Sequence, residues 1–188
     1  MDGRQVRLSK FLALVLRHDP GRVGVTLDPE GWVGVDELLR AAGAAGVPMS
    51  RHELVDVVLT NPKQRFTLDP DGNRIRANQG HSLDVDLRLD PLEPPDVLFH
   101  GTSRTVLAAV LNEGLRPMGR RHVHLCADRD TAVMVGRRHG PPVVLTVASG
   151  RMHADGHRFF RSVNGVWLAE RVPPSYLRGD DGPEWLDG

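Results

Sequence analysis

A proline-rich stretch separates two parts of this chain whose hydrophobic patterns differ. Residues 83–95, which end in Pro91-Leu92-Glu93-Pro94-Pro95, have the composition of a linker. A chain of 188 residues is long enough to form two small domains. We therefore predict a first lobe over residues 1–82, a linker over residues 83–95 and a second lobe over residues 96–188.

The first lobe has the pattern of helices followed by a hairpin. Apolar residues recur at helical spacing over residues 4–17, and residues 50–53 form a capping box that begins a later helix. Between them we expect a short strand over residues 32–35 and a helix capped by Asp36. The turn sequence at 69–73 indicates a β-hairpin. This order is typical of a winged-helix domain, a helix-turn-helix variant.

The second lobe mixes short strands with helices. The expected strands cover residues 97–99, 122–125, 143–147, 159–160 and 166–168. The expected helices cover residues 105–112, with Gly114 as its stop, and 128–138. The sequence therefore predicts an α+β protein.

Composition excludes several classes of protein. A formal net charge of zero argues against a protein that coats nucleic acid. The single cysteine, Cys126, excludes an internal disulfide and a cysteine-rich zinc site. The N-terminus lacks the apolar core of a signal peptide, and no stretch approaches the ~20 apolar residues of a membrane helix. We expect a cytoplasmic monomer.

Arginines at the ends of predicted elements are candidates for binding phosphate. Arginine far outnumbers lysine, and its guanidinium suits bidentate recognition of phosphate. Arg17 and His18 end the first helix, Arg65 begins a hairpin strand, and Arg120 and Arg121 precede a strand. Each also has an ordinary explanation, because a cation at a helix C-terminus stabilises the helix dipole and arginines in turns are commonly solvated.

Residues 76–82 form an unusual polar run that contains no acidic residue. The side chains with hydrogen-bond donors are Arg76, Asn78, Gln79, His81 and Ser82. The run is equally consistent with an exposed hinge and with a loop that contacts phosphate or ribose at a cleft between the lobes.

A second polar group follows the first strand of the second lobe. His100 and Gly101 precede Thr102 and Ser103, whose hydroxyls can donate to ribose or amide groups. We expect the glycine to let the backbone approach a ligand closely. His124, on the next strand, is expected to lie beside His100.

Metal binding by these histidines is disfavoured. His122 and His124 should point to opposite faces of a strand, and no Asp or Glu follows at a ligand spacing to join His100. We therefore predict no metal site.

Motifs along nearly the whole chain match one known family in order. They cover residues 8–12, 16–20, 31–32, 63–66, 76–82, 100–102, 118–125, 135–140 and 165–168. With these residues the chain resembles the RNA 2′-phosphotransferase family of the KptA/Tpt1 type. The resemblance implies a winged-helix-like N-terminal lobe that binds RNA and an ADP-ribosyltransferase-like mixed α/β C-terminal lobe that holds NAD⁺. Cys126 departs from the serine usual in the family.

The resemblance also implies a catalytic tetrad. By motif its members are Arg17, His18, Arg65 and Arg120. Arg121 is the less favoured fourth member, because the family's arginine stands two places before the histidine.

The same resemblance implies the residues that contact the two substrates. Those implied to bind NAD⁺ are His100, Gly101, Thr102, Ser103, His124, Arg138 and Val166. Among these, the triad that is usually His-Tyr-Glu corresponds to His100, His124 and Val166. Those implied to contact the RNA phosphate are Arg17, His18, Arg65, Arg76, Asn78, Gln79 and His81.

The implied reaction has two steps and needs no metal. The 2′-phosphate of a tRNA-like RNA or RNA end attacks the ribose carbon of NAD⁺ that carries nicotinamide, giving an ADP-ribosylated RNA 2′-phosphate. The ribose 2″-hydroxyl then attacks the phosphate. The products are 2′-hydroxyl RNA, nicotinamide and ADP-ribose 1″,2″-cyclic phosphate, as in tRNA splicing.

Two other functions compete with this one. The first is an ADP-ribosyltransferase that modifies nucleic-acid ends or protein and stops after the first step. The second is a winged-helix DNA-binding regulator. The complete tetrad favours the two-step reaction, because only the second step needs every member. Residues 50–60 contain one arginine and two acidic residues, which argues against a DNA-recognition helix.

Overall fold

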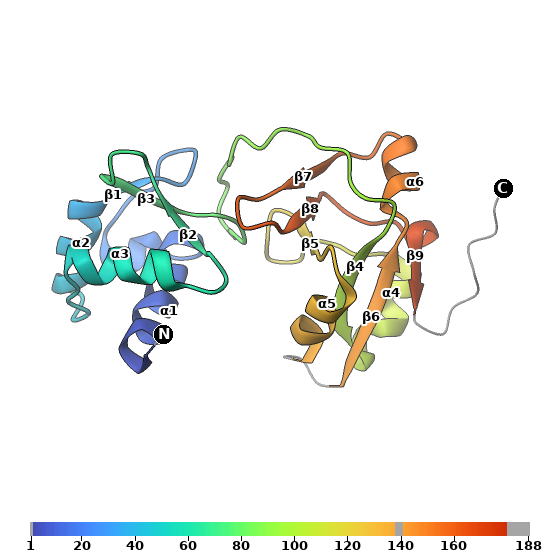
Figure 1. Cartoon of the computed structure of the whole chain (residues 1–188), viewed down its shortest axis with the longest axis horizontal. Helices are drawn as coiled ribbons and strands as arrows, with labels where there is room; N and C mark the ends of the chain where they lie inside the picture. Colours follow the sequence, from blue (N-terminus) through green and yellow to red (C-terminus); the bar gives the residue numbers. More distant parts are fainter. Residues whose placement is uncertain (1, 138–140, 180–188) are drawn as a thin grey trace. The chain divides into compact units, whose positions relative to one another are not determined.

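The structure is a computed structural model that describes residues 2–137 and 141–179. The chain divides into two compact units, Met1–Leu89 and Asp90–Gly188 (Figure 1). The division falls within the segment predicted as a linker, residues 83–95. No described helix is long and apolar enough to cross a membrane.

The segment 83–95 is attached to both units rather than free along its length. On the first unit Val85 is buried, and the Asp86 N–H donates to the Pro29 carbonyl at 2.9 Å. On the second unit the Leu92 N–H donates to the Phe159 carbonyl at 2.8 Å. Backbone hydrogen bonds therefore fix the two ends of this segment.

Unit 1 combines helices with a small antiparallel sheet whose strand order is β1-β3-β2. Its helices are α1 (Gly3–Arg17), η1 (Pro20–Val23), α2 (Val35–Ala44) and α3 (Arg51–Thr60). Its strands are β1 (Val33–Gly34), β2 (Phe66–Leu68) and β3 (Arg74–Ala77). Side chains from all three α-helices and from the sheet share one core, including the fully buried Leu12, Leu38, Leu54 and Ile75.

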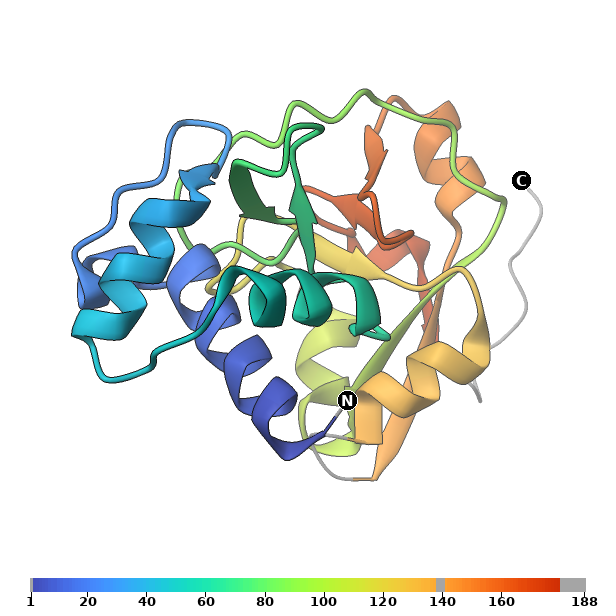
Figure 2. The ribbon, with the colours of Figure 1, turned by 60° about the vertical axis from the view of Figure 1, so that its left-hand side comes forward.

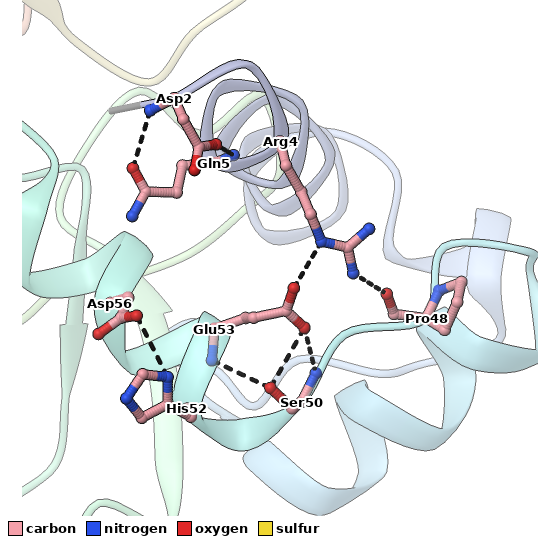
Figure 3. A network of polar contacts seen from close by, with 8 residues as sticks. All are labelled: Asp2, Arg4, Gln5, Pro48, Ser50, His52, Glu53 and Asp56. Carbon is pink, nitrogen blue, oxygen red and sulfur yellow. Dashed lines mark hydrogen bonds and ion pairs between the residues drawn. The ribbon is translucent and has the colours of Figure 1, made fainter.

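Two capping boxes define the starts of α1 and α3, and an arginine of α1 contacts the capping box of α3 (Figure 3). Asp2 caps α1, and Ser50 with Glu53 caps α3, as the sequence predicted for the latter. Arg4 donates to Glu53 and to the Pro48 carbonyl, the latter at 3.0 Å. The hydrogen bond from Arg4 lowers the pKa of Glu53 to about 2. This network fixes the N-terminus of α1 against α3.

Three expectations for unit 1 shift by one or two residues. Strand β1 is shorter than predicted, because α2 already begins at Val35, whose N–H still donates to the Asn73 carbonyl at 2.8 Å. The N-cap of α2 is Gly34, and Asp36 lies in its first turn. Arg65 precedes β2 rather than beginning it.

Unit 2 contains two antiparallel sheets, with strand orders β4-β6-β9 and β5-β8-β7. Its strands are β4 (Leu98–Ser103), β5 (Val123–Leu125), β6 (Pro142–Val147), β7 (Phe159–Arg161), β8 (Trp167–Ala169) and β9 (Leu177–Gly179). Its described helices are η2 (Arg104–Val106), α4 (Leu107–Glu113), α5 (Arg129–Gly136), α6 (Ser149–Ala154) and η4 (Pro174–Tyr176). The α+β class is thus confirmed.

One bridge joins the two sheets. Phe99 of β4 and Cys126, just after β5, exchange both backbone hydrogen bonds, at 2.9 and 2.7 Å. Helix α5 packs against β4 and β6 (Figure 2, where α5 is the yellow-orange helix). This packing places the start of β4 beside β5 and the rest of β4 beneath a helix.

The structure also differs from the sequence prediction in unit 2. The helix predicted over 105–112 begins as the short helix η2, and Gly114, at φ 84°, ends it as predicted. Strand β5 begins at Val123, so His122 lies outside it. Helix α6 and strand β9 were not predicted.

Candidate functional site

A pocket of about 310 Å³ lies on unit 1 along one face of α1, and its lining combines apolar side chains with a lysine and an arginine. Its lining residues are Val6, Ser9, Lys10, Ala13, Leu14, His18 and Arg65. None of them is acidic, and Lys10 and Arg65 are cationic at neutral pH. The pocket brings together two of the predicted tetrad members, His18 and Arg65, and its charge suits an anion.

The predicted polar loop is docked on the C-terminal end of α1. The Ser82 N–H donates to the Arg17 carbonyl at 2.9 Å, and the Ser82 hydroxyl lies 3.0 Å from Nδ1 of His18. Gly80 has a φ of +86°, and a Cβ built there would lie 3.6 Å from Nη1 of Arg17. The structure therefore brings Arg17, His18, Gly80 and Ser82 together.

Other residues of this loop are buried. Asn78, 3 % exposed, accepts from the Thr67 hydroxyl and donates to the Gln64 carbonyl, both at 2.6 Å. His81 is also 3 % exposed, whereas Gln79 is partly exposed. The buried side chains of Asn78 and His81 offer little surface to a ligand, and the hydrogen bonds of Asn78 support the loop.

Arg76 lies over the ring of Trp32, with its guanidinium carbon 4.5 Å from the ring centroid. Burial lowers the pKa of Arg76, and Nη1 donates to the Glu30 carbonyl at 3.4 Å. A cation held over an aromatic ring gains an attraction of ~1 kcal/mol. Arg76 is thus held by Trp32 and Glu30, which precede strand β1.

In unit 2 the predicted pair of histidines is in contact. Nδ1 of His100 lies 3.0 Å from the backbone carbonyl of His124. A carbonyl only accepts, so Nδ1 carries the hydrogen and Nε2 of the neutral ring is an acceptor. Burial lowers the pKa of His100, the hydrogen bond with the His124 carbonyl opposes this in part, and the charge of Arg120 lowers the pKa further. The net shift favours the neutral ring.

Arg120 joins this pair through the side chain of His124. Its Nη1 lies 3.0 Å from Nδ1 of His124. Because a guanidinium only donates, Nδ1 accepts and the hydrogen of the neutral imidazole is on Nε2. The contact links an exposed arginine to His124, whose carbonyl binds His100.

The structure gives Gly101 a role in packing. A Cβ at this position would lie 1.8 Å from the carbonyl oxygen of Ala132 in α5. A helix, and not a ligand, occupies the space that a side chain would need. Thr102 and Ser103 are 8 % and 5 % exposed, so their side chains are also inside the unit.

Val166 closes the hairpin between β7 and β8. Its N–H donates to the Ser162 hydroxyl at 3.1 Å, and its carbonyl accepts from the Ser162 N–H at 2.9 Å. Arg138, the remaining residue predicted to bind NAD⁺, lies outside the described residues.

Comparison with known proteins settles the family. The model of the "RNA 2'-phosphotransferase, Tpt1 / KptA family" matches residues 3–171. This chain belongs to that family.

Similar proteins come from several bacteria. A "Probable RNA 2'-phosphotransferase" of Streptomyces griseus is 55 % identical over 181 residues, which cover 93 % of this chain and 96 % of the relative. One from Agrobacterium fabrum is 56 % identical over 169 residues, covering 90 % and 91 %. One from Nostoc punctiforme is 50 % identical over 177 residues, covering 94 % and 98 %.

Lys10 was missed as a site residue of this phosphotransferase-family chain. It lies in the motif at residues 8–12 that supports the family resemblance, but no role was assigned to its side chain. Lys10, Leu14 and His18 are four residues apart along one helix and its cap, and all line the pocket. Residues spaced by four share one helix face, so the periodicity could have identified Lys10.

Asn61 was missed for a different reason. It follows α3 as its C-cap, and it contacts Arg65, four residues later, and Ser9, which is 52 residues earlier in the chain. No local pattern signals the contact with Ser9.

The histidines do not form a metal-binding cluster with acidic groups in the part of the chain that the structure describes. Across residues 2–137 and 141–179, no group of three or more His, Cys, Asp or Glu side chains could hold a metal ion. The ring of His122 packs against Phe160, with centroids 5.7 Å apart.

Proposed function

We propose that this protein removes a 2′-phosphate from RNA by transferring it to NAD⁺. The products are 2′-hydroxyl RNA, nicotinamide and ADP-ribose 1″,2″-cyclic phosphate. Membership of the family supports the RNA substrate. The observation that carries the proposal is the pocket on unit 1, where His18, Arg65 and Lys10 meet with no acidic residue in the lining.

The pocket has the chemistry that a phosphate dianion needs. Arg65 presents a guanidinium whose Nη1 is fixed at 3.3 Å from Asn61, and His18 is fixed by Ser82 at 3.0 Å. Cations that are already held in place bind phosphate without an ordering cost at each encounter. Arg17, beside Gly80 at the same end of α1, adds a further cation.

Residues of unit 2 fit a dinucleotide substrate. Strand β4 lies at the edge of its sheet, and Phe99 directs its N–H and C=O to the side away from β6. Successive residues alternate, so Gly101 directs its N–H and C=O to the same side. One donor and one acceptor at this edge match a carboxamide such as that of nicotinamide. Nε2 of His100 can accept from a ribose hydroxyl.

NAD⁺ would supply a ribose carbon with nicotinamide as leaving group and a neighbouring 2″-hydroxyl that takes the phosphate. Arginines then stabilise the charge on the phosphoryl group, and this is the role proposed for Arg65 and Arg120. The contact between Arg120 and His124 supports Arg120 as the fourth member of the tetrad. The RNA phosphate is itself the nucleophile of the first step, so no carboxylate is needed to generate one.

The deciding experiment uses a short RNA with one internal 2′-phosphate. The protein, the RNA and NAD⁺ are incubated without added metal and in the presence of EDTA. We expect nicotinamide and 2′-hydroxyl RNA in equal amounts, and none with an otherwise identical strand that lacks the phosphate. Loss of activity in EDTA, restored by Mg²⁺ or Zn²⁺, would contradict the metal-free reaction. Stable ADP-ribosylated RNA without dephosphorylation would favour a transferase that stops after the first step.

A further inference from the structure

Two buried polar side chains, one of which lines the pocket on unit 1, are in contact with each other. Ser9 of α1 is 3 % exposed, and Asn61 at the end of α3 is 2 % exposed. Nδ2 of Asn61 donates to the Ser9 hydroxyl at 2.8 Å. Burying polar groups is unfavourable unless they are hydrogen-bonded, so this pair needs its contacts.

The other end of the Asn61 amide contacts the pocket arginine. Oδ1 accepts from Nη1 of Arg65 at 3.3 Å and from the Lys63 N–H at 3.0 Å. A guanidinium and a backbone N–H only donate, so the carboxamide oxygen must be on this side. Its nitrogen must then donate to Ser9. The chemistry of the neighbours therefore permits one orientation of the amide.

We infer that Asn61 is a positioning residue that aims the Arg65 guanidinium into the pocket, and that Ser9 fixes the amide of Asn61. The inference rests on the proposed binding of the RNA 2′-phosphate by Arg65. Ser9 and Arg65 both line the pocket, and Asn61 connects them through its two hydrogen bonds.

The neutrality of this acceptor matters as much as its position. A carboxylate at position 61 would also accept from Arg65, but it would cancel part of the charge that attracts a phosphate. A carboxamide orients the guanidinium without placing a negative charge beside it. Asn61 thus holds Arg65 in place without neutralising its charge.

The test measures discrimination between two RNA strands without NAD⁺, by fluorescence anisotropy. One strand carries an internal 2′-phosphate, and the other has a 2′-hydroxyl at the same place. We expect Asn61→Ala to lower the affinity for the phosphorylated strand by about tenfold, as for a lost charged hydrogen bond, and to leave the other strand unaffected. Melting curves of each variant report the folded fraction.

A double-mutant cycle separates positioning from a general loss of stability. If Asn61 acts through Arg65, the double variant Asn61→Ala/Arg65→Ala should discriminate no worse than Arg65→Ala alone. Losses that multiply would overturn the inference. Ser9→Ala provides a second variant for the case in which Asn61→Ala does not fold, and it should show a smaller loss of the same kind.

Asn61→Asp tests the argument about charge. It keeps an acceptor for Arg65, and the Ser9 hydroxyl can donate to the new carboxylate, but the phosphorylated strand should bind at least tenfold more weakly. Asn73→Asp makes the same charge change on an exposed residue of unit 1 and should have little effect. Unchanged binding by Asn61→Asp would contradict the inference.

The outcomes also distinguish this inference from the proposed function. A wild-type protein that binds both strands equally would contradict the proposed function. A wild-type protein that discriminates, with Asn61→Ala and Ser9→Ala discriminating equally well, would contradict only the positioning role.

Discussion

Nη1 of Arg120 lies 3.0 Å from Nδ1 of His124, which fixes an arginine of an exposed loop to a histidine of strand β5. The carbonyl of the same histidine accepts from His100. A charged group on this loop and a neutral imidazole on strand β4 are thereby joined through His124. In the proposed reaction this arrangement places the second-step cation close to the residues that hold NAD⁺.

Replacing Arg120 should separate the two chemical steps. In Arg120→Ala the phosphoryl transfer loses a stabilising charge, which is worth ~3–4 kcal/mol by analogy with one oxyanion-hole donor. Departure of nicotinamide depends less on that charge. At single turnover, mass spectrometry should therefore detect RNA that carries ADP-ribose on its 2′-phosphate. Arg116→Ala is the control, because it removes another arginine of unit 2, four residues earlier, that forms an ion pair with Glu113. Equal slowing of nicotinamide release and of the final product would contradict this division.

The ionisation of His100 should respond to Arg120. Burial and the nearby cation both lower the pKa of His100. Removing the charge in Arg120→Ala should raise this pKa, while the ring stays below its ordinary value because it is still buried. Titration of the ring carbon resonances by NMR measures both. Since the folded-state pKa is depressed, this histidine stabilises the fold above its ordinary pKa and loses that contribution as pH falls. A fall in the pKa on removing Arg120 would show that the two do not interact as described.

Lys10 should contribute to RNA affinity mainly through charge. We expect Lys10→Ala to reduce the slope of log affinity against log salt by about one, as for the loss of one phosphate contact. Arg7→Ala removes an exposed cation from the same helix but from outside the pocket lining, and it should change the slope less. Anisotropy titrations at several salt concentrations give the slopes. Equal slopes for Lys10→Ala and the wild type would exclude Lys10 from the binding surface.

Gly101 should tolerate no side chain. Gly101→Ala places a Cβ 1.8 Å from the Ala132 carbonyl, and only a displacement of α5 from β4 can relieve that contact. Overpacking of this kind costs typically 1–3 kcal/mol, and a backbone obstacle makes the larger value the expected one. Gly119→Ala is the matched control, since nothing lies within 4 Å of a Cβ there. Urea denaturation of both variants measures the difference, and equal stabilities would refute the packing argument.

Local signals predicted much of the fold. Helical spacing of Leu8, Leu12 and Val15 identified α1, and the Ser50–Glu53 capping box identified the start of α3. These signals work because the residues that favour each helix lie within that helix or at its N-cap. Helix α6 has only six residues, and β9 only three. Their stability comes from neighbours, such as the Ala148 N–H that donates to the Tyr176 carbonyl, and a window of sequence contains no such information.

The residues of the candidate site were likewise predictable only in part. The resemblance named Arg17, His18, Arg65 and Arg120, and the contacts of His100 with His124 follow from adjacent strands. The buried supports could not be anticipated, because Ser9 and Asn61 are 52 residues apart in sequence. Burial of Asn78 and His81 likewise depends on how the loop docks, which composition does not reveal.

The burial of Cys126, which follows β5 at the bridge to Phe99, has a practical consequence for chemical labelling. Cys126 is the only cysteine of the chain, and burial raises the pKa of its thiol to about 11. At pH 7 roughly one thiol in 10,000 is then ionised, and it is the thiolate that reacts with maleimides and methanethiosulfonates. A cysteine introduced at an exposed position of either unit would therefore react far faster than the native one. The wild-type sequence is already a suitable background for attaching one spin label or fluorophore to each unit and for following both during a catalytic cycle.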